Sequence, residues 1–342
     1  MDGEQSKKQL FGQFFTTNQE YILQGMKIPD YIENIIEPFA GNGDLLEFVA
    51  KNNKQYNIEC FDIDPKKDFI IQKDTIADPP NYNNAFILTN PPYLARNKSN
   101  NKTLFDKYDV NDLYKCFMKE ILTNICLGGI LIVPLNFWSS IILLRKLFLE
   151  KYNILRLNIF EEQVFKDTTY TICSFQFELR TQIVENLLNI VIYPSNITIT
   201  TTLNDENNFM IGGEILHNIY TITRATKKNK NKLNTNILVK CIDDNAENQI
   251  GLSFVDDDKI FIDNTPNQSA RTYATLIIEP SIDKKKQQLL VFKFNEFLRE
   301  HRTKYNSLFL TNYRESKDIA RKRISFDLVY SITQYILQSA NF

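Results

Sequence analysis

Short apolar runs alternate with amphipathic segments over the first 135 residues of the chain. Four runs predict strands, at residues 34–36, 58–63, 85–89 and 130–135. Before the last of these, residues 113–125 place apolar side chains every four positions, which is the spacing of one helix face. This alternation predicts an α/β fold, with a parallel sheet and helices on both of its faces.

The pattern of apolar and polar positions changes after about Arg180. The following sequence is rich in Asn and Thr and predicts strands, as at residues 197–202, whereas the chain from Lys286 onward has a largely helical pattern. We therefore predict two domains, at residues 1–182 and 183–342. Each is long enough to bury a core of its own.

Composition places the chain among ordinary globular proteins, with 43% hydrophobic and 24% charged residues. The first ten residues are polar, and no apolar stretch has the length that a bilayer requires. The five cysteines form no Cys-x-x-Cys pair, so we predict reduced thiols and no metal site. Together these features predict a cytoplasmic protein without a membrane segment.

Net charge is −1 and by itself does not favour a nucleic-acid partner. The basic residues are nevertheless clustered in the second half of the chain. One cluster, residues 224–240, holds six basic residues and no acidic one, and a second cluster spans residues 314–323. Such clusters are often solvated surfaces, but two of them in a neutral chain favour a local phosphate-binding surface.

The first candidate site follows the strand at residues 34–36. Glu37 ends this strand, and Gly41 and Gly43 lie in the turn before a helix that we expect to start near Asp44. Glycines allow the backbone to approach a ligand closely, and a helix N-terminus favours an anionic group such as a carboxylate. Two glycines in a turn are weak evidence when taken alone.

Two acidic residues end the next strands. Asp62 lies about 20 residues beyond the glycines, the spacing at which a carboxylate binds ribose hydroxyls. Asp74 follows a short apolar run and is placed to accept a hydrogen bond from an adenine amino group. Either residue could also be a simple turn residue.

The most specific signal is Asn90-Pro91-Pro92-Tyr93, which directly follows the apolar run at residues 85–89. A double proline ends a strand, and it presents the Asn90 side chain and the Pro91 carbonyl at the carboxyl edge of the sheet. Two neighbouring acceptors suit both hydrogens of one amino group, and Tyr93 offers a ring on which a base can stack. A polar loop, residues 94–112, follows directly and is expected to be functional.

In this order, the blocks resemble the gamma class of adenine-specific DNA methyltransferases from type II restriction-modification systems. The resemblance covers roughly residues 9–180 and includes an N-terminal Gly-x-x-x-Thr segment from Gly12 to Thr16, where Thr17 replaces the usual proline. It implies a Rossmann-like class I methyltransferase sheet, S-adenosylmethionine as cofactor and a C-terminal target-recognition domain. It also implies double-stranded DNA as substrate, transfer to the N6 amine of a flipped-out adenine, and a separate cognate restriction endonuclease.

The resemblance also carries over site residues. Cofactor binding is implied for Gly12, Phe14, Thr16, Glu37, Pro38, Ala40, Gly41, Gly43, Asp62, Ile63, Asp74 and Asn90. The catalytic group is implied to be Asn90, Pro91, Pro92 and Tyr93, with Phe165 as a second ring that stacks on the extruded base. In the second domain, we expect DNA contacts from Arg271, Tyr273, Asn312, Arg314, Arg321 and Arg323.

Several alternatives remain open. The same tetrapeptide occurs in enzymes that methylate RNA or a protein glutamine, and an N4-cytosine DNA methyltransferase handles a similar amine, although Ser more often replaces Asn90 there. A catalytically silent DNA-binding protein on the same fold is a further alternative. The sequence does not specify the recognition site or whether the protein is a monomer or a dimer.

Overall fold

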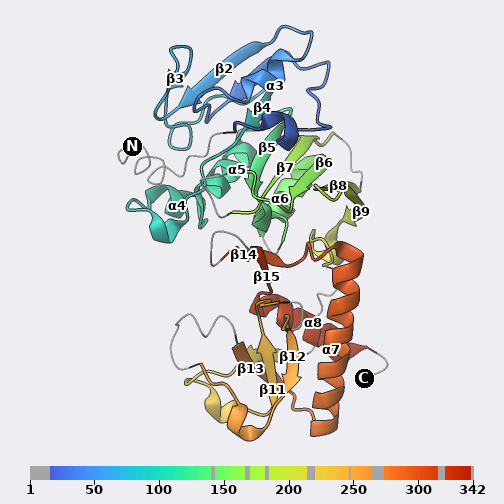
Figure 1. Ribbon diagram of the computed structural model, residues 1–342. Coiled ribbons are helices and arrows are strands. Elements are labelled where there is room, and N and C mark those ends of the chain that lie inside the picture. The colour runs from blue at the N-terminus through green and yellow to red at the C-terminus, as the bar shows by residue number, and fades with distance from the viewer. Residues whose placement is uncertain are drawn as a thin grey trace. The chain divides into compact units, whose positions relative to one another are not determined.

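The computed structural model describes residues 16–139, 143–165, 170–181, 185–213, 220–245, 248–263, 273–314 and 320–339. The chain divides into two compact units (Figure 1). The first unit extends to Leu203, and the second comprises residues 204–342 together with the short segment 138–141. The predicted boundary at residues 182 and 183 therefore lies about 20 residues too early.

The first unit is built on a nine-stranded sheet with the order β3-β2-β1-β4-β5-β7-β6-β8-β9. The strands are β1 (Asn34–Glu37), β2 (Asn57–Asp62), β3 (Ile71–Gln72), β4 (Ala85–Thr89), β5 (Gly128–Pro134), β6 (Tyr152–Phe160), β7 (Ile172–Leu179), β8 (Asn186–Tyr193) and β9 (Ile197–Leu203). The first five strands in this order, from β3 at the edge to β5, pair in parallel. Strand β7 is antiparallel to its two neighbours, β5 and β6. This large and mostly parallel sheet confirms the predicted α/β class.

The helices of this unit are short. They are α2 (Gln19–Ile22), α3 (Leu46–Ala50), α4 (Thr103–Tyr108), α5 (Leu113–Thr123) and α6 (Leu143–Lys151). The predicted helix at residues 113–125 is confirmed as α5, whose apolar face is buried. The helix expected near Asp44 is α3, but it begins only at Leu46 and has five residues.

The central strands β4 and β5 are buried along their whole length, so both of their faces belong to the core. Gly128 and Gly129 are the first two residues of β5. A β-carbon at Gly129 would lie 2.4 Å from the Ile87 carbonyl oxygen and 2.9 Å from the Phe177 ring. Position 129 therefore requires glycine, because β4 and β7 both approach β5 closely there.

Strands β8 and β9 explain why the first unit is longer than predicted. Strand β8 pairs in parallel with β6, and β9 pairs antiparallel with β8. Leu188, Ile190 and Ile192 alternate along β8 and are buried. Because the sequence shows alternation but not the pairing partner, these strands were assigned to the second domain.

The second unit contains a four-stranded sheet, a β-hairpin and two longer helices. Its elements are β10 (Thr221–Arg224), β11 (Ile237–Lys240), β12 (Gly251–Phe254), β13 (Tyr273–Glu279), α7 (Lys284–Tyr305), β14 (Thr311–Arg314), β15 (Ala320–Arg323) and α8 (Phe326–Gln338). The sheet order is β10-β13-β11-β12, and β14 pairs with β15. The stretch after Lys286 is thus helical in α7 and α8 but contains a hairpin that the helical pattern did not predict.

Two further observations bear on the expectations from composition. All five cysteines are buried, and none forms a disulfide. In the part of the chain that the structure describes, no helix is long and apolar enough to cross a membrane.

Candidate active site

A cavity of about 300 Å³ lies at the carboxyl ends of β1, β2 and β4. The strand order reverses between β1 and β4, and in open α/β sheets ligands bind at such a switch point. The cavity brings together nine of the predicted site residues. They are Thr16, Glu37, Ala40, Gly41, Asp62, Ile63, Asp74, Asn90 and Pro92.

The loop after β1 is fixed by Asp62. One carboxylate oxygen of Asp62 accepts a hydrogen bond from the Gly41 amide at 2.8 Å, and the other accepts from the Asp64 amide at 2.8 Å. Gly41 has a φ of 54° and Gly43 a φ of 78°, values that glycine adopts without strain. Asp62 therefore organises both the glycine loop and the turn after β2. A carboxylate has about four acceptor sites, which is the chemistry that ribose hydroxyls require.

Glu37 is the most deeply buried acid of the cavity, with 1% of its surface exposed. Its Oε2 atom has no hydrogen-bond partner among the described residues. Burial raises the pKa of Glu37 well above its usual value, and the neighbouring Asp44 and Asp62 carboxylates raise it further. The side chain therefore holds its proton to a higher pH than an exposed glutamate does.

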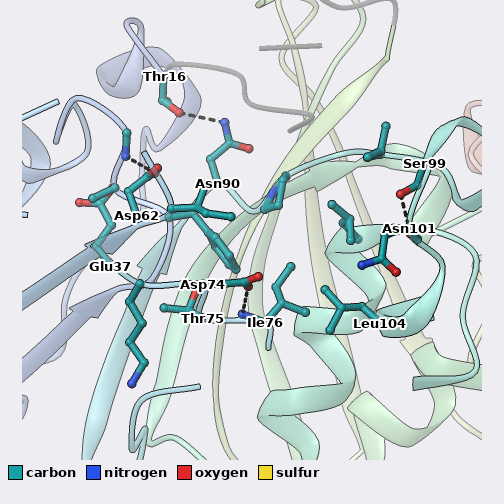
Figure 2. A pocket seen from close by; sticks show the side chains of 18 of the residues that line it. Thr16, Glu37, Asp62, Asp74, Thr75, Ile76, Asn90, Ser99, Asn101 and Leu104 are labelled. Atoms are coloured by element: carbon teal, nitrogen blue, oxygen red, sulfur yellow. Dashed lines mark hydrogen bonds between the residues drawn. The ribbon is translucent and has the colours of Figure 1, made fainter. Parts of the chain in front are cut away.

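Asp74 and Thr75 shape the opposite wall of the cavity. Asp74 accepts hydrogen bonds from the amides of Ile76 and Ala77, at 3.2 and 3.1 Å, and so closes the turn after β3. Thr75 donates to the Pro38 carbonyl at 2.8 Å, which ties this turn to the glycine loop. Figure 2 shows Asp74, Thr75 and Ile76 between the Asp62 side of the cavity and Leu104.

The Asn90 side chain is held from two sides at the end of β4. Its amide nitrogen donates to the Thr16 hydroxyl at 3.1 Å, as Figure 2 shows. Its amide oxygen accepts from the Tyr93 hydroxyl. That hydroxyl also lies 2.7 Å from the Ile132 carbonyl, which competes for its single hydrogen. The Tyr93 hydroxyl can therefore donate either to the Asn90 oxygen or to the Ile132 carbonyl.

Tyr93 does not offer a ring face to the cavity. Only 3% of its surface is exposed, and its ring packs edge-on against Tyr114 and Tyr170, with centroid distances of 6.2 and 5.9 Å. Phe165 is also buried and does not line the cavity. Base stacking on these two rings stays a prediction, and it requires that they become uncovered.

The outer wall of the cavity comes from the segment after the tetrapeptide. Residues 98–101 and the side chains of Leu104, Phe105 and Leu113 line it. Figure 2 shows Ser99, Asn101 and Leu104 on the side away from Glu37 and Asp62. The polar composition of residues 94–112 had indicated a functional loop, but it gave no sign of helix α4 or of these contacts.

Carboxyl groups outnumber ammonium groups in the cavity. The lining includes four acids, Glu37, Asp44, Asp62 and Asp74, but two lysines, Lys73 and Lys98. Lys73 also forms an ion pair with Asp78 at 3.0 Å. Even with Glu37 protonated, negative charge predominates, which favours a cationic ligand and disfavours a phosphate-bearing nucleotide.

Three of the remaining predicted cofactor and catalytic residues lie beside the cavity rather than in its lining: Pro38, Gly43 and Pro91. Pro38 and Pro91 are buried. Gly12 and Phe14 lie outside the described residues, as does Arg271 of the predicted DNA contacts.

The remaining predicted DNA contacts belong to two elements of the second unit. Tyr273 begins β13, and Asn312, Arg314, Arg321 and Arg323 lie in the β14–β15 hairpin. In this hairpin Arg321 and Arg323 alternate with Lys322, which pairs with Asn312. Because side chains alternate along a strand, Arg321 and Arg323 share one face of the hairpin, whereas Asn312 and Lys322 share the other.

Part of the basic clusters is neutralised within the second unit. Arg321 lies 3.5 Å from the Asp244 carboxylate, which also accepts from Lys240 at 2.6 Å. Arg224 lies 3.6 Å from Asp263, and its guanidinium lies 4.7 Å from the centre of the Phe326 ring. These basic side chains therefore have a structural role, which the sequence spacing alone did not reveal.

No protein-family model matches the sequence, and neither does any curated protein. Among solved structures, a modification subunit of a putative type I restriction enzyme from Vibrio vulnificus is similar, with 15% identity and a TM-score of 0.40 over 54% of this chain and 48% of that one. A putative class I S-adenosylmethionine-dependent methyltransferase from Listeria monocytogenes has 13% identity and a TM-score of 0.37 over 56% and 64% of the two chains.

The M protein of the type I restriction enzyme EcoKI has 12% identity and a TM-score of 0.37 over 89% of this chain and 74% of that protein. The chain spans about half the length of the Vibrio subunit. Similarity at this level does not decide the function, which rests on the geometry of the site.

Proposed function

We propose that this chain is an S-adenosylmethionine-dependent DNA methyltransferase that modifies the exocyclic N6 amine of adenine in a short duplex site. The observation that supports this most directly is the Asn90 amide, held between Thr16 and Tyr93 at the rim of an acidic cavity. An amide oxygen is a neutral hydrogen-bond acceptor and not a nucleophile. A fixed amide oxygen instead suits the binding of an amino group.

The cavity residues fit the proposed cofactor. S-adenosylmethionine carries an ammonium group and a sulfonium group, and when bound it supplies an activated methyl group. The buried Glu37 carboxyl, whose Oε2 lacks a partner among the described residues, is placed to bind the ammonium. Asp62 would bind the ribose hydroxyls and Asp74 the adenine amine, while Ile76, Leu104 and Leu113 provide apolar contacts.

The role of Asn90 follows from the chemistry of the amine. The lone pair of the adenine amino nitrogen is delocalised into the ring, so this nitrogen is a poor nucleophile. Hydrogen bonds from the amine to the Asn90 oxygen and the Pro91 carbonyl favour a more tetrahedral nitrogen. They would also stabilise the positive charge that develops on it during transfer, and acceptors that are held in position before the reaction need little reorganisation.

The target adenine must leave the duplex to reach this cavity, since its amine is otherwise inside the base stack. The second unit would bind the duplex, with Lys227, Lys228 and Lys230 as exposed candidates for phosphate contacts. A partner endonuclease would be a separate chain. Cytoplasmic location follows from this function and is part of the proposal.

One experiment separates this proposal from its alternatives. The purified chain is incubated with radiolabelled S-adenosylmethionine and, separately, with duplex DNA, RNA and protein, and the label is then mapped. Label on N6 of adenine in DNA supports the proposal, whereas label on cytosine N4, on RNA or on glutamine identifies one of the rival enzymes. Binding of DNA without transfer to any substrate would indicate a catalytically silent protein.

A further inference from the structure

Asp112 is a buried carboxylic acid next to the proposed active site, and the mechanism above does not use it. It occupies the N-cap position of α5, but its side chain makes no capping hydrogen bond. Only 8% of its surface is exposed, and its Oδ1 atom has no partner among the described residues. A buried carboxyl oxygen without a hydrogen-bond partner is unfavourable for stability, so its position calls for a functional explanation.

The backbone of Asp112 is joined to the chain that leaves the tetrapeptide. Asp112 and Ala95 form an isolated antiparallel bridge. On either side of it, the Arg96 amide donates to the Asn111 carbonyl at 2.9 Å and the Leu113 amide donates to the Leu94 carbonyl at 3.1 Å. The two residues after Tyr93 are therefore fixed against the start of α5, and this contact closes the base of the loop formed by residues 96–110.

The Asp112 carboxyl also faces the aromatic cluster that surrounds Tyr93. Burial raises the pKa of Tyr93, Tyr114 and Tyr170, and the Asp112 charge adds a smaller contribution in the same direction. The Tyr93 ring packs edge-on against the other two. The Tyr93 hydroxyl in turn donates to the Asn90 amide oxygen. Asp112 is thus connected to Asn90 both through the backbone of residues 94–95 and through the packing of Tyr93.

We propose that Asp112 is a positioning residue of the methyltransferase site, whose carboxylate holds the tetrapeptide in the geometry that methyl transfer requires. This inference rests on the proposed function. In the ionised form, the carboxylate attracts the backbone N–H groups of Leu94, Leu113 and Tyr114, which lower its pKa. Protonation removes this attraction at Leu94 and loosens the segment that fixes Tyr93 and Asn90.

The charge state of Asp112 changes near neutral pH. Burial raises its pKa to about 6, although Lys115 and the nearby amides oppose the shift. The other titratable groups that face it are Tyr93, Tyr114, Tyr170, Cys116 and Lys115. Burial raises the pKa of the three phenols and of the Cys116 thiol, so these groups stay neutral near pH 6. Lys115 provides the facing positive charge.

The test compares Asp112→Asn with the native chain in a DNA methylation assay between pH 5 and 8.5. The variant keeps the shape of the side chain but cannot ionise. We expect kcat at pH 7.5 to fall about tenfold to a hundredfold, the scale for a displaced catalytic group, with an unchanged dissociation constant for S-adenosylmethionine. The native profile should lose activity as pH falls through about 6, and the variant should lack this limb.

Glu120→Gln is the matched control, because Glu120 is an equally buried acid on the same helix and accepts a hydrogen bond from Tyr108 at 2.7 Å. It should keep both kcat and the acidic limb. If Asp112→Asn retains the native kcat and the native limb, the inference is wrong while the proposed function stands. If Asp112→Asn raises the dissociation constant for S-adenosylmethionine and lowers the unfolding midpoint together with kcat, Asp112 is only structural. A native chain that methylates no DNA overturns both proposals.

Discussion

At the scale of single residues, the site depends on side chains whose partners fix their orientation. Asn90 is held by Thr16 and Tyr93, and Asp62 by the amides of Gly41 and Asp64. Such preorganisation is valuable because the charge of the transition state then meets acceptors that are already in place. Asn90 and Glu37 give the sharpest tests of the proposed site.

Asn90→Ala should reduce turnover by about two to three orders of magnitude, the scale for the loss of one preorganised hydrogen-bonding group. The variant should still fold and bind S-adenosylmethionine, because the lost bond forms mainly in the transition state. Single-turnover methylation and calorimetry measure the two effects. Asn90→Ser is the matched variant and should lose less, since a hydroxyl also accepts a hydrogen bond. Near-native turnover of Asn90→Ala would show that the tetrapeptide is only a turn.

The raised pKa of Glu37 predicts that binding of S-adenosylmethionine releases a proton. Its pKa is raised well above the usual value in the empty protein, whereas a bound ammonium group would favour the carboxylate. Affinity should therefore rise with pH until the pKa of the empty protein is passed. Calorimetry in two buffers of different ionisation enthalpy measures the released proton, and Glu37→Gln should abolish the release and weaken binding. A native protein that binds the cofactor without proton release would contradict this role.

The raised pKa of Glu37 also determines how this residue makes the unfolding free energy depend on pH. The folded chain holds the Glu37 proton to a higher pH than the unfolded chain does. The resulting stabilisation is complete below the pKa of Glu37 in the unfolded chain, and it is lost as pH rises through the pKa of Glu37 in the folded chain. The unfolding free energy of Glu37→Gln should accordingly depend less on pH in this range than that of the native chain.

At the scale of elements, the sequence predicts strands well where apolar runs are continuous. Strand β4 has the predicted bounds, and β1, β2 and β5 differ from them by one or two residues at their ends. The sequence does not predict which strands pair when the partner strand is distant along the chain. The alternation along β8 and β9 is visible in the sequence, but the pairing of β8 with β6, which joins both strands to the large sheet, is a long-range contact. The β14–β15 hairpin was missed because its short strands lie between two helices in a region of helical pattern.

The same distinction applies to the candidate site. Residue types at strand ends were sufficient to predict Glu37, Asp62, Asp74 and Asn90 at one edge of the sheet, because parallel strands bring their carboxyl ends together. The burial of Tyr93 and the contacts of Asp112 depend on packing between α5, β5 and β7. Helical and strand periodicity contain no information on such packing.

Among basic elements, the turn after β10 is the best candidate for phosphate binding. Lys227, Lys228 and Lys230 are exposed, and no ion pair is seen for them within the described part of the chain. Replacing all three with Gln should weaken binding to every duplex by a similar factor. It should also flatten the salt dependence by roughly 0.9 in log–log slope per lost phosphate contact.

The matched control for this turn replaces Lys284, Lys285 and Lys286 at the start of α7 with Gln, which removes the same charge from the same unit. Fluorescence anisotropy at several salt concentrations compares the two variants. An equal loss in both would indicate a general charge effect. A loss confined to the cognate sequence would show that the lysine turn reads bases instead.

At the scale of the whole molecule, the boundary at Leu203 predicts which fragment folds. A fragment of residues 1–203 contains the whole nine-stranded sheet, whereas residues 1–182 lack β8 and β9 and expose the edge of β6. We expect the longer fragment to unfold cooperatively and to bind S-adenosylmethionine. The shorter one should aggregate or unfold at much lower denaturant, because the core loses Leu188, Ile190 and Ile192. Equal stability of both fragments, measured by urea denaturation, would place the boundary where the sequence predicted it.

The close approach of strands at Gly129 has a consequence for inherited variation. Even an alanine there would place its methyl group 2.4 Å from the Ile87 carbonyl and force β4 away from β5. Because β4 ends at Asn90, the displacement would reach the amide that is proposed to bind the target amine. If the chain methylates DNA as proposed, a missense change at Gly129 should therefore abolish that activity as a change in the tetrapeptide would. In a host that also had the proposed cognate nuclease, such an allele would leave the chromosome open to cleavage.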